Sequence, residues 1–368
     1  MAFGDTDKVV PATKMSPDPL LIHIGLHKTG STWLQQAIFN DPARGFTTET
    51  GAPRHELVHD FVLPDPLAYD PQEARQLYLP YVDAAAATGQ TLVLSHERLS
   101  GYPSSGGYDR ALIAERLHAS FPEAKILIVL REQRALIRSM YSQHITDGGN
   151  GTLDQFLYRP ERGLGRRPWF NFDMYAFDRL IELYRRLFGT DRVMVLTYEH
   201  LNTDSQGFVD AISAFCGQPA VSVSNTIPRN RRRIWMMQEV QRRLNGWLYD
   251  NELSPGALVH VQRFAGRFAS MEPVFRALVP RALDRRMQAK LQRRVDHEVG
   301  GHFAESNART AAVTGLDLGS LGYMMGDIDW ALANNGDAFP SDRPSVPTRK
   351  NASMLVTSRG TRPVHLPQ

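Results

Sequence analysis

The stretch Ile24-Gly25-Leu26-His27-Lys28-Thr29-Gly30-Ser31-Thr32-Trp33-Leu34 decides the fold. It continues the short apolar run that begins at Leu20, and residues 31–39 carry apolar side chains at helical spacing. The pattern therefore predicts a strand, a glycine-bearing loop and a helix. Such a loop turns its backbone amides toward one point, where the helix N-terminus adds partial positive charge. We expect this loop to bind an anion.

The side chains of the loop strengthen this interpretation. Lys28 adds a full positive charge, and Ser31 and Thr32 add hydroxyl donors. The Walker A pattern of nucleotide-binding proteins is G-x-x-x-x-G-K-[ST], whereas here the lysine precedes the second glycine. The plainer alternative is a tight turn with a solvated lysine, and the combination of residues favours the anion site.

Short apolar runs alternate with helical patterns farther along the chain. Strands are expected at residues 91–94, 125–130 and 192–196, and helices at residues 109–121, 133–144 and 206–216. This alternation predicts an α/β fold with a parallel sheet covered on both faces. From Arg231 onward the pattern is helical, with no clear strand.

The composition of the chain predicts its domain organisation. Residues 1–18 are expected to form a flexible arm, and residues 331–368 a loosely ordered tail, because proline is frequent and large apolar residues are few. Residues 19–330 are expected to form one domain, with a core at 19–230 and a helical part at 231–330.

The segment from His27 to Trp33, following a short apolar strand, resembles the 5′-phosphosulfate loop of sulfotransferases that use 3′-phosphoadenosine 5′-phosphosulfate (PAPS). The resemblance continues at Arg131, which ends an expected strand, and at Ser139 eight residues later. That family uses such a pair to hold the 3′-phosphate. The resemblance to bacterial-type members implies the P-loop-containing nucleotide-hydrolase-like fold, a three-layer sandwich with a helical C-terminal extension. It also implies PAPS as donor, PAP as product, and no metal.

The resemblance also assigns a set of residues to the cofactor. Looser matches cover Tyr198 and Glu199, expected to be structural, and a segment that begins at Asn230. The residues expected to bind the cofactor are His27, Lys28, Thr29, Gly30, Ser31, Thr32, Trp33, Arg131, Ser139, Asn230 and Arg231.

Sulfuryl transfer needs charge stabilisation and a general base. Lys28 is expected to neutralise the oxygen of the leaving phosphate. The base should lie at another strand end of the same rim, where the sequence has His96 and Glu97 after the strand at 91–94. His96 has the better intrinsic pKa, and Glu97 matches a Ser-x-Glu-x-Leu pattern that resembles bacterial members. Glu97 is slightly favoured, and both remain candidates.

Two basic segments are candidates for further contacts with anions or with the acceptor. The run Arg229 to Arg233 is either a solvated helix start or a partner of the 3′-phosphate or of an anionic acceptor. Arg166 to Phe170 is either part of the core or an acceptor-side rim for a sugar ring. A glycan or another polyhydroxy acceptor would fit such a rim, and small alcohols, lipids and phenols stay open.

Composition excludes several classes of protein. The longest apolar runs are far shorter than the ~20 residues that span a bilayer, and no secretory signal opens the chain. The single cysteine, Cys216, allows no intramolecular disulfide, so a cytoplasmic protein is expected. The 42 Lys plus Arg against 39 Asp plus Glu leave a net charge of only +3, which is low for a protein that binds nucleic acid.

The nearest alternative to a sulfotransferase is a P-loop kinase or NTPase. Such an enzyme needs an aspartate for magnesium at a strand end, and the sequence has Arg131 at such a position. Oligomeric state cannot be predicted.

Overall fold

The computed structural model describes residues 19–48, 56–158, 170–223, 233–248, 253, 261 and 264–326. These residues belong to one compact unit that spans Met1–Ile328. The expected arm and tail lie outside the described residues, as do Asn230 and Arg231.

A five-stranded sheet forms the centre of the fold, with strand order β2-β3-β1-β4-β5 and all neighbours parallel. Its strands are β1 (Leu20–His23), β2 (Phe46–Thr47), β3 (Thr91–Ser95), β4 (Lys125–Leu130) and β5 (Val193–Thr197). The four strands expected from the apolar runs are confirmed to within two residues. β2 was not predicted, because two residues carry no readable pattern.

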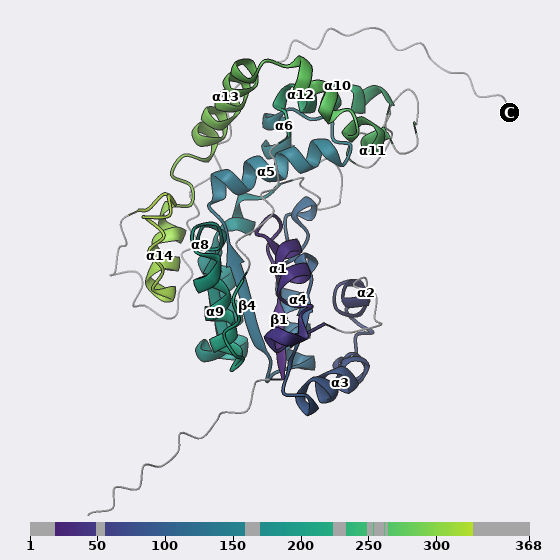
Figure 1. Cartoon of the computed structure of the whole chain (residues 1–368), viewed down its shortest axis with the longest axis vertical. Coiled ribbons are helices and arrows are strands. Elements are labelled where there is room, and N and C mark those ends of the chain that lie inside the picture. The colour runs from purple at the N-terminus through teal and green to yellow at the C-terminus, as the bar shows by residue number, and fades with distance from the viewer. Residues whose placement is uncertain are drawn as a thin grey trace, which may run out of the picture. The chain divides into compact units, whose positions relative to one another are not determined.

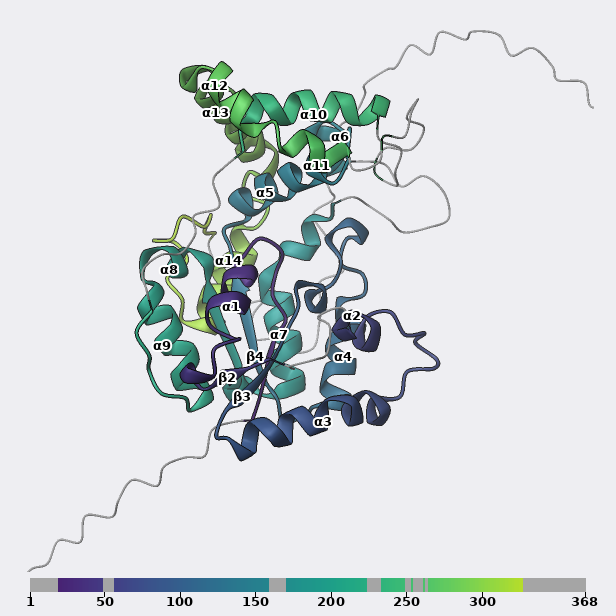
Figure 2. The same ribbon diagram turned by 45° about the vertical axis from the view of Figure 1, so that its right-hand side comes forward.

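Helices cover both faces of the sheet, as Figures 1 and 2 show. The helices before the C-terminal part are α1 (Ser31–Ala37), α2 (Glu56–Phe61), α3 (Pro71–Ala87), α4 (Arg110–Ser120), α5 (Gln133–Thr146), α6 (Leu153–Tyr158), α7 (Phe177–Phe188), α8 (Tyr198–Thr203) and α9 (Ser205–Cys216). Of these, α2, α3, α6, α7 and α8 were not among the expected helices. Asp70 begins α3 by accepting a hydrogen bond from the Gln72 amide, and Pro71 follows at the first helical position.

The two faces of the sheet have separate apolar cores because successive side chains of a strand point to opposite sides. Leu20 and Ile22 of β1 pack in the larger cluster with α3, α4 and α7. Leu21 packs in the other cluster with α1 and α9. The fold is therefore a three-layer α/β/α sandwich, as the sequence predicted.

The C-terminal part is helical in the residues described. Its helices are α10 (Trp235–Leu248), α11 (Phe264–Ala269), α12 (Glu272–Leu278), α13 (Arg281–Val299) and α14 (Ala304–Thr314). Helices α10 and α13 contact α5, and α14 contacts α7 (Figure 1). No helix within the described ranges is long and apolar enough to cross a membrane.

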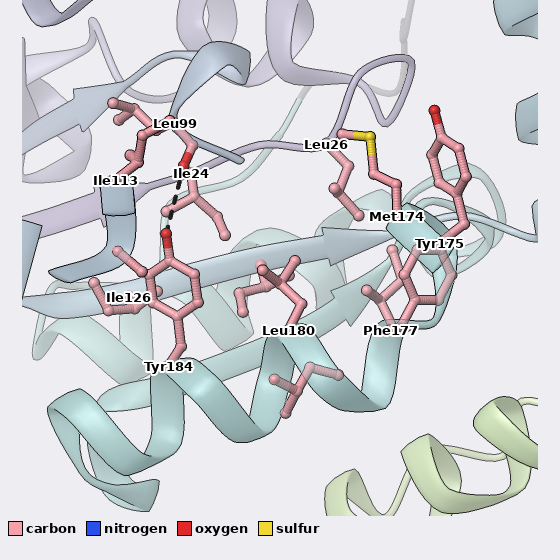
Figure 3. Packing of buried hydrophobic residues seen from close by; sticks show 14 of the residues in the cluster. Ile24, Leu26, Leu99, Ile113, Ile126, Met174, Tyr175, Phe177, Leu180 and Tyr184 are labelled. Atoms are coloured by element: carbon pink, nitrogen blue, oxygen red, sulfur yellow. Dashed lines mark hydrogen bonds between the residues drawn. The ribbon is translucent and has the colours of Figure 1, made fainter. Parts of the chain in front are cut away.

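The larger core anchors the segment that follows β3. Leu99 is fully buried in the short helix Glu97–Ser100, and the hydroxyl of the buried Tyr184 donates to the Leu99 carbonyl at 3.5 Å. Figure 3 shows Tyr184 reaching from α7 to Leu99 between Ile24 and Ile126. The core thus holds in place the backbone that carries His96 and Glu97.

Candidate functional site

Polar segments follow four neighbouring strands at the carboxyl edge of the sheet. β1 leads into the loop of His27 and Lys28, β3 into His96 and Glu97, β4 into Arg131, and β5 into Tyr198 and Glu199 of α8. Parallel strands end at the same edge, so these groups share one rim. Ligands of open α/β sheets bind at this edge.

The loop after β1 has an unusual backbone. Lys28 has a φ of 67°, and it is the one residue other than glycine with a positive φ in the described part of the chain. That conformation costs a non-glycine residue about 1–2 kcal/mol. The Thr29 hydroxyl is buried and donates to the Leu26 carbonyl at 2.6 Å, which closes the turn from inside. The loop therefore holds Lys28 in a conformation that it would not adopt alone.

Two features require glycine at position 30, its backbone conformation and a close contact. Its φ is 91°, and a Cβ atom there would come within 2.9 Å of Leu201 Cδ2 in α8. Helix α8 thus packs directly against the backbone of the loop.

Arg131 forms a hydrogen bond with the backbone of the loop that follows β1. Its Nη1 donates to the Lys28 carbonyl oxygen at 2.7 Å, and its guanidinium carbon lies 4.7 Å from the centre of the Tyr198 ring. The two cationic motifs of the sequence, 103 residues apart, therefore lie side by side.

The ammonium of Lys28 is held from helix α5. Lys28 Nζ donates to Gln143 Oε1 at 2.6 Å, and Gln143 Nε2 donates to Asp147 Oδ1 at 2.5 Å. Burial lowers the pKa of Lys28, the charges of Asp147 and Glu97 raise it, and the positive charges around it lower it further.

Several polar groups of the loop have no partner among the described residues. Ser31 Oγ and His27 Nδ1 are buried without a hydrogen bond. The backbone N–H groups of Gly30, Ser31 and Thr32 likewise have no acceptor in the described chain. The first N–H groups of a helix are free to bind an anion, and here they lie in the same loop as Lys28 and the two buried side-chain atoms. The residues present therefore fit an anionic group such as phosphate or phosphosulfate.

Burial also affects the histidine of the loop. It lowers the pKa of His27 to about 4, although the negative charge of Glu97 opposes the shift. The imidazole is therefore neutral near pH 7.

His96 and Glu97 lie next to this loop. A Cβ atom at Gly25 would lie 3.3 Å from Glu97 Cα, so the two segments are in contact. His96 Nδ1 accepts a hydrogen bond from the Arg98 amide at 3.0 Å and begins the helix Glu97–Ser100. Both side chains are half-buried.

Glu199 joins three segments of the rim. Its carboxylate accepts hydrogen bonds from the Glu132 amide at 3.1 Å and from the Tyr323 hydroxyl at 3.0 Å. Burial raises its pKa, and these hydrogen bonds oppose the shift. Glu199 thus links α8 to the turn after β4 and to the segment of Tyr323.

The other predicted residues differ in exposure. Thr32 is exposed, Ser139 on α5 is half-buried, and Trp33 packs against the apolar cluster of α1 and α9. Phe170 is buried, with its ring stacked on Tyr175 at 5.2 Å. Phe170 therefore belongs to the core and not to an acceptor rim, whereas residues 166–169 lie outside the described chain.

Gln143 and Asp147 were missed by the sequence analysis. Gln143 lies one helical turn after Ser139, and Asp147 one turn after Gln143. Residues four apart share a helix face, so the face predicted to carry Ser139 could have suggested both. In the described chain, no group of three or more His, Cys, Asp or Glu side chains is placed to hold a metal ion.

Three solved structures illustrate what this chain is similar to. A sulfotransferase from Alicyclobacillus acidocaldarius is 18% identical with a TM-score of 0.42, over 61% of this chain and 90% of that chain. The sulfotransferase domain of the curacin biosynthetic pathway is 13% identical with a TM-score of 0.35, over 77% and 97%. That of the Synechococcus PCC 7002 olefin synthase is 15% identical with a TM-score of 0.34, over 72% and 97%.

Comparison by sequence points to one family. No curated protein matches the chain. The family model for sulfotransferases matches residues 19–222, which include the loop, all five strands and helices α1 to α9. Because this match covers more than half of the chain, the protein belongs to the sulfotransferase family.

Proposed function

We propose that this sulfotransferase uses PAPS as its donor and transfers the sulfuryl group to an acceptor hydroxyl or amine. The active unit would be residues 19–330. One observation carries the proposal: Arg131 donates to the backbone of Lys28 at 2.7 Å. It brings the two expected phosphate-binding motifs to a single rim, beside donors that have no partner among the described residues.

The donor would be held at two points. Residues 27–33 would bind its 5′-phosphosulfate, and Arg131 and Ser139 its 3′-phosphate, since a guanidinium can bind phosphate through two parallel hydrogen bonds. Asn230 and Arg231 stay predictions, because they lie outside the described residues. When bound, PAPS supplies the sulfuryl group, with its 5′-phosphate as leaving group. Lys28 places positive charge where the leaving oxygen becomes negative.

We propose Glu97 as the general base that takes the proton of the acceptor. The Nδ1 atom of His96 accepts from the Arg98 amide, so a neutral imidazole carries its proton on Nε2 and has no free lone pair to offer. Glu97 starts the same short helix, and its charge acts on both Lys28 and His27. His96 would then orient the segment.

The acceptor would bind on the same rim, beside Glu97. A glycan or another polyhydroxy molecule remains our first expectation, although Phe170 does not contribute to a rim for it. Transfer from sulfur-35-labelled PAPS to a panel of sugars, alcohols, lipids and phenols tests this expectation. With the acceptor found, Glu97→Gln should lose about a hundredfold or more of turnover while binding PAP normally. His96→Gln should retain most of the turnover, and the opposite ranking would make His96 the base.

Calorimetric titration with PAP in the absence of magnesium tests the donor. We expect roughly micromolar binding, with Lys28→Ala and Arg131→Ala each weakening it by about tenfold or more. Arg186→Ala, an exposed arginine of α7, serves as control and should bind like the wild type. Absence of PAP binding together with magnesium-dependent ATP binding would replace this proposal with the kinase alternative.

A further inference from the structure

The hydrogen bond of the Lys28 ammonium goes to a helix turn to which neither the motif nor the family match assigns a role. Gln143 and Asp147 both lie at the end of α5, where the Asp147 amide donates to the Gln143 carbonyl at 2.8 Å. Their side chains form a series of two hydrogen bonds. The Lys28 ammonium donates to the Gln143 amide oxygen at 2.6 Å, and the Gln143 amide nitrogen donates to the Asp147 carboxylate at 2.5 Å.

The chemistry of the three groups determines how this series is oriented. An ammonium can only donate hydrogen bonds and a carboxylate can only accept them, whereas an amide does both. The carboxylate of Asp147 therefore turns the NH2 end of Gln143 toward itself. The oxygen end is left facing Lys28. Without Asp147, the Gln143 amide could rotate and present donors to the ammonium.

We infer that Gln143 and Asp147 are positioning residues for Lys28: the amide of Gln143, oriented by the carboxylate of Asp147, holds the ammonium at the phosphate-binding loop. An ammonium has three N–H donors. One donor goes to Gln143, which leaves the others for an anion in the loop. The role of this arrangement in holding PAPS rests on the proposed function, but the arrangement itself does not.

The charges around Lys28 give Asp147 a second role. Arg131 and Arg233 lower the pKa of Lys28, as does burial, and Asp147 and Glu97 oppose them. His27, the next residue, is neutral near pH 7 because burial lowers its pKa to about 4. The positive charge of Arg233, which precedes α10, lowers the pKa of Asp147, against the effect of burial. Asp147 thus helps to keep Lys28 charged near the two arginines.

Exchanging the two groups tests the inference. Asp147→Asn keeps the shape and removes the charge, so Lys28 should lose its proton at lower pH than in the wild type. The double variant Gln143→Glu/Asp147→Asn moves the carboxylate next to Lys28 and reverses only the hydrogen bond between positions 143 and 147. In this variant Lys28 should lose its proton at higher pH than in the wild type. If the two side chains did not face the Lys28 ammonium, the midpoints would not follow this order.

The measurement is an NMR titration of lysine labelled with carbon-13 at Cε. The chain has only six lysines, Lys8, Lys14, Lys28, Lys125, Lys290 and Lys350, and Lys28→Arg identifies the signal. Asp154→Asn, a carboxylate that pairs with Arg294 on α13, is the control and should titrate like the wild type. Equal titration midpoints in wild type and Asp147→Asn, or a double variant that titrates at or below Asp147→Asn, would overturn the inference.

PAP binding separates this inference from the proposed function. If the wild type binds PAP, Gln143→Leu should weaken binding by roughly tenfold, because Lys28 is no longer held, and unchanged affinity would count against a positioning role. If the wild type does not bind PAP, the proposed donor is wrong. The order of the Lys28 midpoints, measured without ligand, still decides whether Gln143 and Asp147 act on Lys28.

Discussion

Burial of the single residue His27 makes the free energy of unfolding of the protein depend on pH. Its pKa is lowered from 6.5 to about 4, so between these values the unfolded chain binds a proton that the folded chain does not. Stability contributed by the neutral imidazole is therefore complete above pH 6.5 and is lost as the pH falls toward 4.

The pH dependence of unfolding tests this at the residue scale. We expect the wild type to lose about 2 kcal/mol more stability than His27→Gln when the pH falls from 7.5 to 5. Urea denaturation of both proteins at the two pH values provides the comparison, since the other titrating groups are common to both. Parallel losses in the two proteins would mean that His27 is protonated in the folded state.

At the scale of elements, the contact between the loop and α8 determines where the loop can lie. Gly30 combines a positive φ with a close approach to Leu201, whereas Gly89, after α3, has a positive φ with nothing near the Cβ position. The two glycines therefore separate the cost of the backbone conformation from the cost of the contact.

Alanine at each glycine tests this separation. Gly89→Ala should lower the free energy of unfolding by about 1 kcal/mol, and Gly30→Ala by roughly a further 1–3 kcal/mol because α8 has to move. PAP affinity should fall only in Gly30→Ala. Denaturant unfolding and calorimetry measure the two effects, and equal losses of stability would show that the contact with α8 costs nothing.

At the scale of the whole molecule, α14 and the segment that follows it pack against the rim, although both lie beyond the family match at 19–222. Arg134 donates to the Gly322 carbonyl at 2.6 Å, and Gln133 and Asn307 exchange two buried side-chain hydrogen bonds. Tyr323 reaches Glu199 from the same segment. The chain after residue 303 thus supports the turn that carries Arg131.

Two tyrosine–glutamate hydrogen bonds allow a matched test. Tyr323 is 3% exposed, whereas Tyr158, whose hydroxyl donates to Glu298 at 3.1 Å, is 37% exposed. Tyr323→Phe should cost about 1–3 kcal/mol, because the buried carboxylate loses a donor, and should weaken PAP binding through Arg131. Tyr158→Phe should cost about 0.5 kcal/mol or less. A Tyr323→Phe protein as stable as Tyr158→Phe would show that this segment does not support the rim.

The sequence by itself determined the features that depend on neighbouring residues. The run from Leu20 to Leu34 indicates strand, loop and helix because periodicity, glycine and lysine occur together within fifteen residues. The alternation of apolar runs and helical patterns likewise predicted the three-layer fold. The cofactor role of Arg131 and Ser139 stays a prediction, although the contact of Arg131 with Lys28 supports it.

Only the tertiary structure decided which side chains meet. Gln143 lies 115 residues from Lys28, and Tyr323 lies 124 residues from Glu199, so no local pattern could connect either pair. The sequence favoured Glu97 over His96 only slightly as the base, because the hydrogen bond that occupies His96 Nδ1 depends on the path of the backbone at Arg98. A sequence specifies which groups can donate, accept or carry charge, whereas the packing of helices on the sheet determines their distances, and the chemistry of the site depends on both.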